Sequence, residues 1–93
     1  MQTRMVHKLL YIKSCTVHKL FKTTIEDMVY NTNDIKKMVY CHETNTTSIH
    51  IKDEYGHRIK IEGDCIQSII EGLHKDYTKG IIIDKRCKVK EIL

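Results

Sequence analysis

The segment at residues 48–64, SIHIKDEYGHRIKIEGD, alternates isoleucine with polar residues on both sides of a short polar turn. An alternation with a period of two is typical of a β-strand that has one buried and one solvated face. The turn contains Gly56, and glycine tolerates the positive φ that tight hairpin connections often need. We therefore predict a β-hairpin formed by strands 48–52 and 57–61.

The two faces of this hairpin differ in chemistry. One face carries Ile49, Ile51, Ile59 and Ile61, and the other carries Ser48, His50, Lys52, Arg58, Lys60 and Glu62. The isoleucine face supplies a hydrophobic core, and the opposite face is basic and solvated.

Two helices are predicted around this hairpin. Residues 65–79 follow Asp64, a good N-cap, and place Ile66, Ile69, Ile70, Leu73 and Tyr77 on one stripe. Residues 16–30 also repeat apolar side chains at intervals of three and four, which favours a helix over a strand.

The remaining segments predict strands at residues 5–12, 37–42 and 81–90. The expected order is strand, helix, three strands, helix, strand. We predict an α+β fold in which one small, mostly antiparallel sheet has two helices on one face. At 93 residues, the chain should form a single domain over 1–93.

The excess positive charge is concentrated near residue 85. The formal net charge is +4, and residues 79–90, KGIIIDKRCKVK, hold five basic groups and one acid. The other residues carry 11 basic and 11 acidic groups, so this segment accounts for the whole excess. Local density of Lys and Arg, rather than total charge, governs binding to phosphates.

These charges define a candidate surface for an acidic partner. The predicted binding residues are Lys52, Tyr55, Arg58, Lys60, Lys85, Arg86, Lys88 and Lys90. The expected partner is a nucleic acid, a nucleoprotein complex or an acidic surface of a host protein. Tyr55 is the best candidate for stacking on bases, with Tyr11 and Tyr40 behind it. A plain solvated face is the alternative, because lysines also protect sheet edges from aggregation.

Motifs of enzymes and cofactor sites are missing from the sequence. It contains no glycine-rich phosphate loop, HExxH, CxxC or GxSxG pattern, so we expect a non-enzymatic binding protein without a cofactor. Two alternatives stay open. Cys15, His18, Cys41 and His42 would form a zinc set if the first helix packed beside the second strand. His57 with Arg58, or His50, would serve a small metal-independent ribonuclease.

Composition and the lengths of the apolar segments indicate where the protein acts and what kind of genome encodes it. No apolar run, III at 81–83 included, is longer than four residues, and no leader pattern is visible, so we expect a cytoplasmic protein with no membrane contact and reduced cysteines. Ala, Pro and Trp are absent while Ile occurs 14 times, which indicates an AT-rich genome. Such a chain suits a viral or phage regulator that inhibits a nucleic-acid-processing complex of its host. A pure protein–protein inhibitor is the alternative, and exposed strand edges would allow a homodimer.

Overall fold

The computed structural model of the chain describes residues 9–53, 56–74 and 80–90. Its strands are β1 (Leu9–His18), β2 (Thr23–Asn31), β3 (Ile35–Cys41), β4 (Thr46–Ile51), β5 (Arg58–Glu62), β6 (Ile81–Ile83) and β7 (Cys87–Lys90). One α-helix, α1 (Ile66–His74), and one 3₁₀ turn, η1 (Thr32–Asp34), complete the described elements. The fold is α+β, with a mixed, mostly antiparallel sheet of seven strands.

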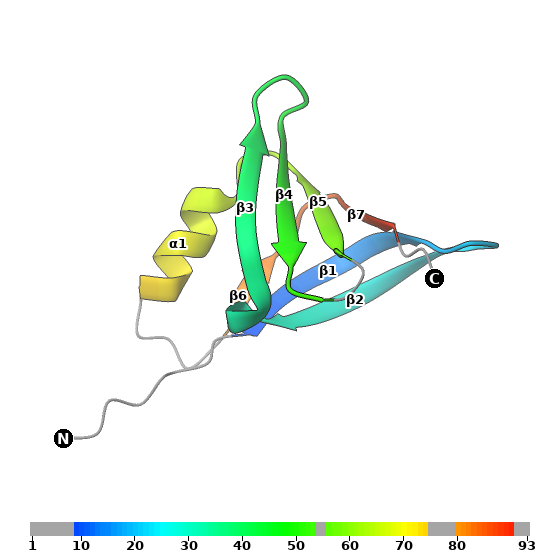
Figure 1. The fold of residues 1–93 in the computed structure, drawn as a ribbon, viewed down its shortest axis with the longest axis horizontal. Helices are drawn as coiled ribbons and strands as arrows, with labels where there is room; N and C mark the ends of the chain where they lie inside the picture. The colour runs from blue at the N-terminus through cyan, green and yellow to red at the C-terminus, as the bar shows by residue number, and fades with distance from the viewer. Residues whose placement is uncertain (1–8, 54–55, 75–79, 91–93) are drawn as a thin grey trace.

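The strands pair in the order β2-β1-β7-β5-β4-β3, and β6 also pairs with β1. β1 is the central organising strand, because it is antiparallel to β2 and parallel to both β6 and β7. Its first half pairs with β6 and its second half with β7. The last described strand therefore lies between the first strand and the β3–β4–β5 meander (Figure 1).

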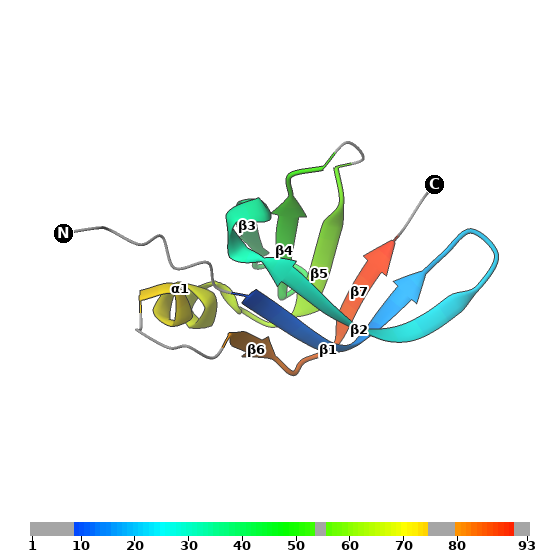
Figure 2. The ribbon, with the colours of Figure 1, turned by 90° about the horizontal axis from the view of Figure 1, so that it is seen from below.

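The sheet coils around its own core. β2 and β3 are the last strands at the two ends of the pairing order, yet only the three residues of η1 separate them in sequence. The N–H of Lys52 donates to the carbonyl of Asp34 at 2.7 Å, and the hydroxyl of Tyr30 lies 3.0 Å from Nε2 of His57. β3, β4 and β5 consequently cross β1 and β2 at a steep angle (Figures 1 and 2).

The core fills the concave side of this coil. Its buried members are Leu10, Ile12, Cys15, Ile49, Ile51, Ile59, Ile61, Cys65, Ile69, Ile83, Cys87 and Val89. α1 contributes Ile69 and lies beside β3 and β6. Asp64 accepts a hydrogen bond from the N–H of Ile66 at 3.2 Å, as expected of an N-cap.

A buried hydroxyl ties the meander to the start of α1. Thr47 on β4 is fully buried, and its Oγ1 donates to the carbonyl of Gly63 at 2.7 Å. The same oxygen accepts from the N–H of Cys65 at 3.0 Å. Both backbone groups sit in the connection between β5 and α1, so Thr47 satisfies them where no strand or helix does.

The predicted hairpin is confirmed as β4 and β5. All four of its isoleucines are buried, while Arg58, Lys60 and Glu62 are exposed. Gly56 has a φ of 62°, the left-handed value that the turn predicted. The strand boundaries differ from the prediction by one or two residues, and Tyr55 lies outside the described residues.

The predicted helix at 16–30 is wrong: these residues form the end of β1, a turn and β2. The apolar spacing of three and four was coincidental, because Leu20, Phe21 and Ile25 are all exposed. The segment is rich in threonine and in β-branched residues, which favour strands. The prediction of two helices on one face of the sheet is therefore wrong. The described residues contain a single α-helix, α1.

Three further boundaries change. The first strand runs over Leu9–His18 rather than 5–12, and residues 1–8 lie outside the described ranges. The second helix is confirmed over Ile66–His74, and its predicted end at 75–79 is not described. The last strand, predicted as continuous over 81–90, is interrupted at residues 84–86. β6 and β7 are thus separate strands that pair with different parts of β1.

Candidate functional site

Two lysines face each other at the centre of the outward side of the sheet. Lys60 on β5 is the direct cross-strand partner of Lys88 on β7. Both are exposed, and their sequence neighbours on either side are buried. The row that contains them runs across six strands: Val39, Ser48, Lys60, Lys88, Thr16 and Ile25. Like charges placed directly opposite each other destabilise a sheet, so this arrangement carries a cost in the free protein.

The neighbouring cross-strand row adds two more cations and a histidine that becomes positively charged when it is protonated. His50 on β4 pairs with Lys37 on β3 and with Arg58 on β5. The pKa of His50 is lowered from its ordinary value, first by desolvation and then by repulsion from Arg58, Lys37 and Lys36. We define the basic face as Lys37, Arg58, Lys60 and Lys88, with His50 among them.

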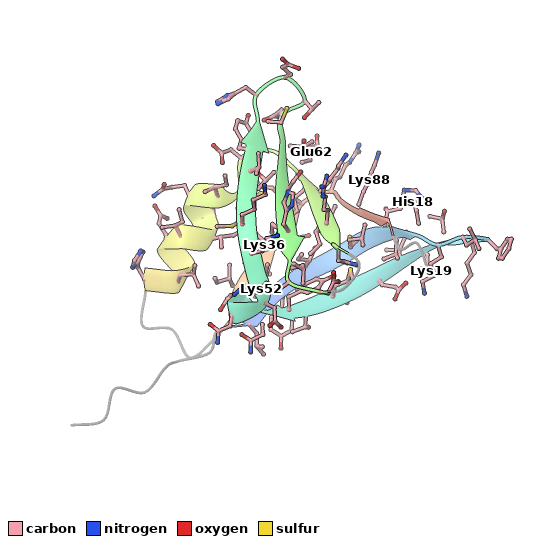
Figure 3. The ribbon with its side chains drawn as sticks, in the orientation of Figure 1. His18, Lys19, Lys36, Lys52, Glu62 and Lys88 are labelled. Atoms are coloured by element: carbon pink, nitrogen blue, oxygen red, sulfur yellow. The ribbon has the colours of Figure 1, made fainter. Side chains whose placement is uncertain are left out.

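The basic face continues into an open depression at the end of the β4–β5 hairpin. Its lining residues are Lys36, His50, Ile51, Lys52, Asp53, Gly56 and Arg58. Nζ of Lys52 donates to the carbonyl of Asn33 at 3.3 Å, and Asp53 accepts from the N–H of His57 at 2.9 Å. Lys36 and Lys52 lie on the same side of β3 and β4 in Figure 3. Three cations surround one carboxylate here, so the depression favours anions.

Carboxylates are scarce on the basic face. Glu62 reaches Arg86 at 3.9 Å, in an exposed pair. Within the described ranges, Lys37, Arg58, Lys60 and Lys88 have no carboxylate oxygen within 4.0 Å. Their charges are therefore available to an external anion.

The other predicted binding residues divide into three groups. Arg86 is exposed but lies beside Glu62, at the margin of the face. The Lys85 ammonium lies against Gly63, in the connection that follows β5, 3.5 Å from where a Cβ would stand. Lys90 belongs to β7, where its backbone pairs with His18. Sequence reasoning missed Lys37 and Lys36, although their place at the start of a strand beside the hairpin was a usable signal.

The proposed zinc set does not assemble. Cys15 and His18 lie on opposite faces of β1, since Cys15 is buried and His18 is exposed. Sγ of Cys15 contacts Sγ of Cys87 at 2.7 Å instead. Within the described residues, no group of three or more His, Cys, Asp or Glu side chains gathers in a way that would hold a metal ion.

The four thiols differ in accessibility. Burial raises the pKa of Cys15, Cys65 and Cys87, because the thiolate loses its hydration there. Cys41 is half-buried at the end of β3, and hydrogen bonds from Thr44 and Glu43 lower its pKa. The described cysteines are all free.

The structure brings together only part of the ribonuclease alternative. His57 is directed to Tyr30 on the inner side, with 3.0 Å between Nε2 and the hydroxyl oxygen. His50 and Arg58 are adjacent on the outer side. Acid–base work on one phosphodiester by two histidines would need His50 and His57 around one point, and they lie on opposite sides of the sheet.

One exposed feature escaped the sequence reading altogether. The turn between β1 and β2 holds Leu20, which is 68% exposed, and Phe21, which is 93% exposed. The N–H of Lys19 donates to the carbonyl of Lys22 at 2.8 Å across this turn. We call residues 19–22 the apolar tip. It projects beyond every other described element at the end of the β1–β2 hairpin (Figure 1).

Comparison of the chain with protein-family models, with curated proteins and with solved structures gave no match. In the described part of the chain, no helix has the length and apolarity needed to cross a membrane.

Proposed function

We propose that the protein is a non-enzymatic binding protein whose basic face docks on the phosphate backbone of a nucleic acid. The observation that carries this proposal is the direct opposition of Lys60 and Lys88 at the middle of the sheet. Each lysine weakens the fold of the free protein through repulsion, and a bound phosphate removes that repulsion. Arg58 and Lys37 extend the positive electrostatic potential into the neighbouring cross-strand row.

Charge neutralisation makes the binding dependent on salt. If the four cations of the basic face each contact a phosphate, the slope of log affinity against log salt is about −3 for a single strand. The measurement is fluorescence anisotropy of a labelled, mixed-sequence oligonucleotide of about 20 nucleotides over a series of salt concentrations.

Matched charge reversals locate the contact. Lys60→Glu with Lys88→Glu should lower the affinity at least about tenfold and reduce the salt slope by about 1.4. Lys85→Glu with Arg86→Glu changes the net charge equally but lies off the central pair, so we expect a smaller loss. Equal losses in the two double variants would show that total charge, and not the basic face, is what matters. An unchanged affinity in both would contradict the proposal.

Protonation of His50 provides a second readout. Its pKa is lowered in the free protein by desolvation and by neighbouring cations, so the imidazole is neutral to a lower pH than that of an ordinary histidine. A bound phosphate favours the charged imidazole, so the complex takes up a proton and binds more tightly as the pH falls from 7 toward 5.5. His50→Gln should flatten this pH dependence.

A further inference from the structure

We infer that the apolar tip is a stacking platform for an unpaired base, with Phe21 as the ring that contacts it. This inference rests on the proposed function, because the same strand of nucleic acid would follow the basic face to the tip. It names the partner more narrowly: a single-stranded segment or an unpaired end, rather than any polyanion.

The turn holds the ring outward. Phe21 and Leu20 are the two residues between the ends of a turn closed by the hydrogen bond from Lys19 to Lys22. A ring that packed back on the hairpin would lose exposure, and Phe21 keeps 93% of its surface accessible. A base has a π-face that stacks on an aromatic ring without regard to its sequence.

Charge and polarity connect the tip to the basic face. Lys88 is the neighbour of Thr16 on β1, and His18 lies two residues further along the same strand. Oγ1 of Thr23 lies 3.3 Å from Nδ1 of His18 at the base of the tip. Lys88 and His18 project from the same side of the molecule in Figure 3. A nucleic acid strand therefore meets cationic or hydrogen-bonding groups along this whole path.

The length of the path suits a short strand. Phe21 is five positions beyond Thr16, so their Cα atoms lie at most about 17 Å apart, the reach of a fully extended chain. That distance equals about five nucleotides at the spacing of one strand in a stacked helix. A phosphate at Lys60 and Lys88 and a base at Phe21 are thus compatible with one bound segment.

A lipid surface is the competing occupant of an exposed apolar tip. Only Leu20 and Phe21 would enter the bilayer, because the residues on both sides are Lys19, Lys22, His18 and Thr23. Membrane binding scales with the apolar area that is buried, and two side chains supply little of it, whereas a single ring suffices to stack on a base. The observations favour the base.

The sequence offers a clean spectroscopic test. The chain contains no tryptophan, so Phe21→Trp introduces a single indole at the tip. Titration with the labelled single-stranded oligonucleotide should quench its emission in parallel with the rise in anisotropy, because a stacked base lies against the ring. Anisotropy that rises while the emission stays constant would refute the stacking platform and leave the basic face intact. A chain that binds no oligonucleotide contradicts the proposed function and the inference together.

Further variants distinguish stacking on the aromatic ring of Phe21 from contact with an apolar side chain of any kind. Phe21→Ala and Phe21→Leu should each lower the affinity for the single strand about tenfold without changing the salt slope. Ile25→Ala, which removes another exposed apolar side chain from the same hairpin, should leave the affinity unchanged. An abasic oligonucleotide of equal length should bind the native chain as weakly as it binds Phe21→Ala.

The membrane alternative has its own readout. Vesicles of phosphatidylcholine with phosphatidylserine should not shift the emission of Phe21→Trp. A blue shift with vesicles, and no quenching by the oligonucleotide, would overturn the inference and assign the tip to a lipid surface. Because Phe21 is so exposed, none of the Phe21 substitutions should change the thermal unfolding midpoint, which circular dichroism checks.

Discussion

The β4–β5 hairpin and the β1–β2 hairpin use the same kind of residues in opposite ways. In β4 and β5, every isoleucine faces the core and every charged residue faces solvent. In β2, no residue is fully buried, and apolar side chains occur on both faces. Hydrophobic periodicity is readable only where one face is buried and the other is wet. An edge strand with two partly exposed faces carries no such signal.

The bulge in β1 adds to the difference. Leu10 and Ile12 face the core, and after an extra residue near Ser14 the core-facing positions become Cys15 and Val17. Ser14 has a φ of 53°, and its N–H donates to Asp27 at 2.8 Å. The alternation is thus broken in the middle of the strand that organises the sheet.

The largest difference we predict is in the rate of thiol alkylation. It compares Cys15, on the buried face of β1, with Cys41, at the end of β3. Cys41 should react with iodoacetamide in the native protein, at a pH below the usual thiol range because its pKa is lowered. Cys15, Cys65 and Cys87 should react at least about a thousandfold more slowly, since they require opening of the core. Mass spectrometry of timed samples identifies each site. Fast labelling of Cys15 would show that the core beneath β1 and β2 opens frequently in the native protein.

The same substitution at two isoleucines tests the comparison directly. Ile59→Ala on β5 should lower the free energy of unfolding by about 2–5 kcal/mol, because it leaves a cavity in a fully buried position. Ile25→Ala on β2 should cost less than about 1 kcal/mol, because that side chain is 74% exposed. Urea denaturation gives both values. Similar losses at the two sites would mean that the apolar side of β2 is covered in solution.

Removal of the buried Thr47 hydroxyl tests the hydrogen bonds that join β4 to the connection between β5 and α1. Thr47→Val should cost about 1–3 kcal/mol, since the N–H of Cys65 and the carbonyl of Gly63 lose their partner. Thr46→Val removes only a hydrogen bond to the exposed Thr44 hydroxyl, so its cost should stay within about 0.5 kcal/mol. A cost for Thr47→Val no larger than that of Thr46→Val would indicate that the two backbone groups find new partners.

The smallest effect concerns the bulge. Ser14→Gly should stabilise the protein by up to about 1 kcal/mol, because glycine adopts a positive φ without steric cost. Asn45→Gly is the control: its φ is 52°, but asparagine tolerates this region, so its gain should be smaller. Thermal unfolding resolves the difference. Destabilisation by Ser14→Gly would show that the serine side chain, and not the backbone, maintains the bulge.

The contrast between the hairpins explains what the sequence could predict. Asp64 with the Ile66–Ile69 spacing identified α1, and the isoleucine alternation identified β4, β5 and the outward position of Arg58 and Lys60. Both signals come from residues close in sequence. The pairing of Lys60 with Lys88 depends on a long-range register, and Phe21 was assigned to a helix because its spacing matched one. The pairing of β5 with β7 decided the first and the pairing of β1 with β2 the second, and tertiary pairing overrides local spacing.

The parallel pairing of β1 with β7 has a consequence for synthesis. β1 is synthesised before β7, and one edge of its second half stays open until residues 87–90 emerge. Until then the nascent chain carries an unfilled strand edge, which invites association with other nascent chains. The sheet closes only with the segment that delivers Lys88 to it.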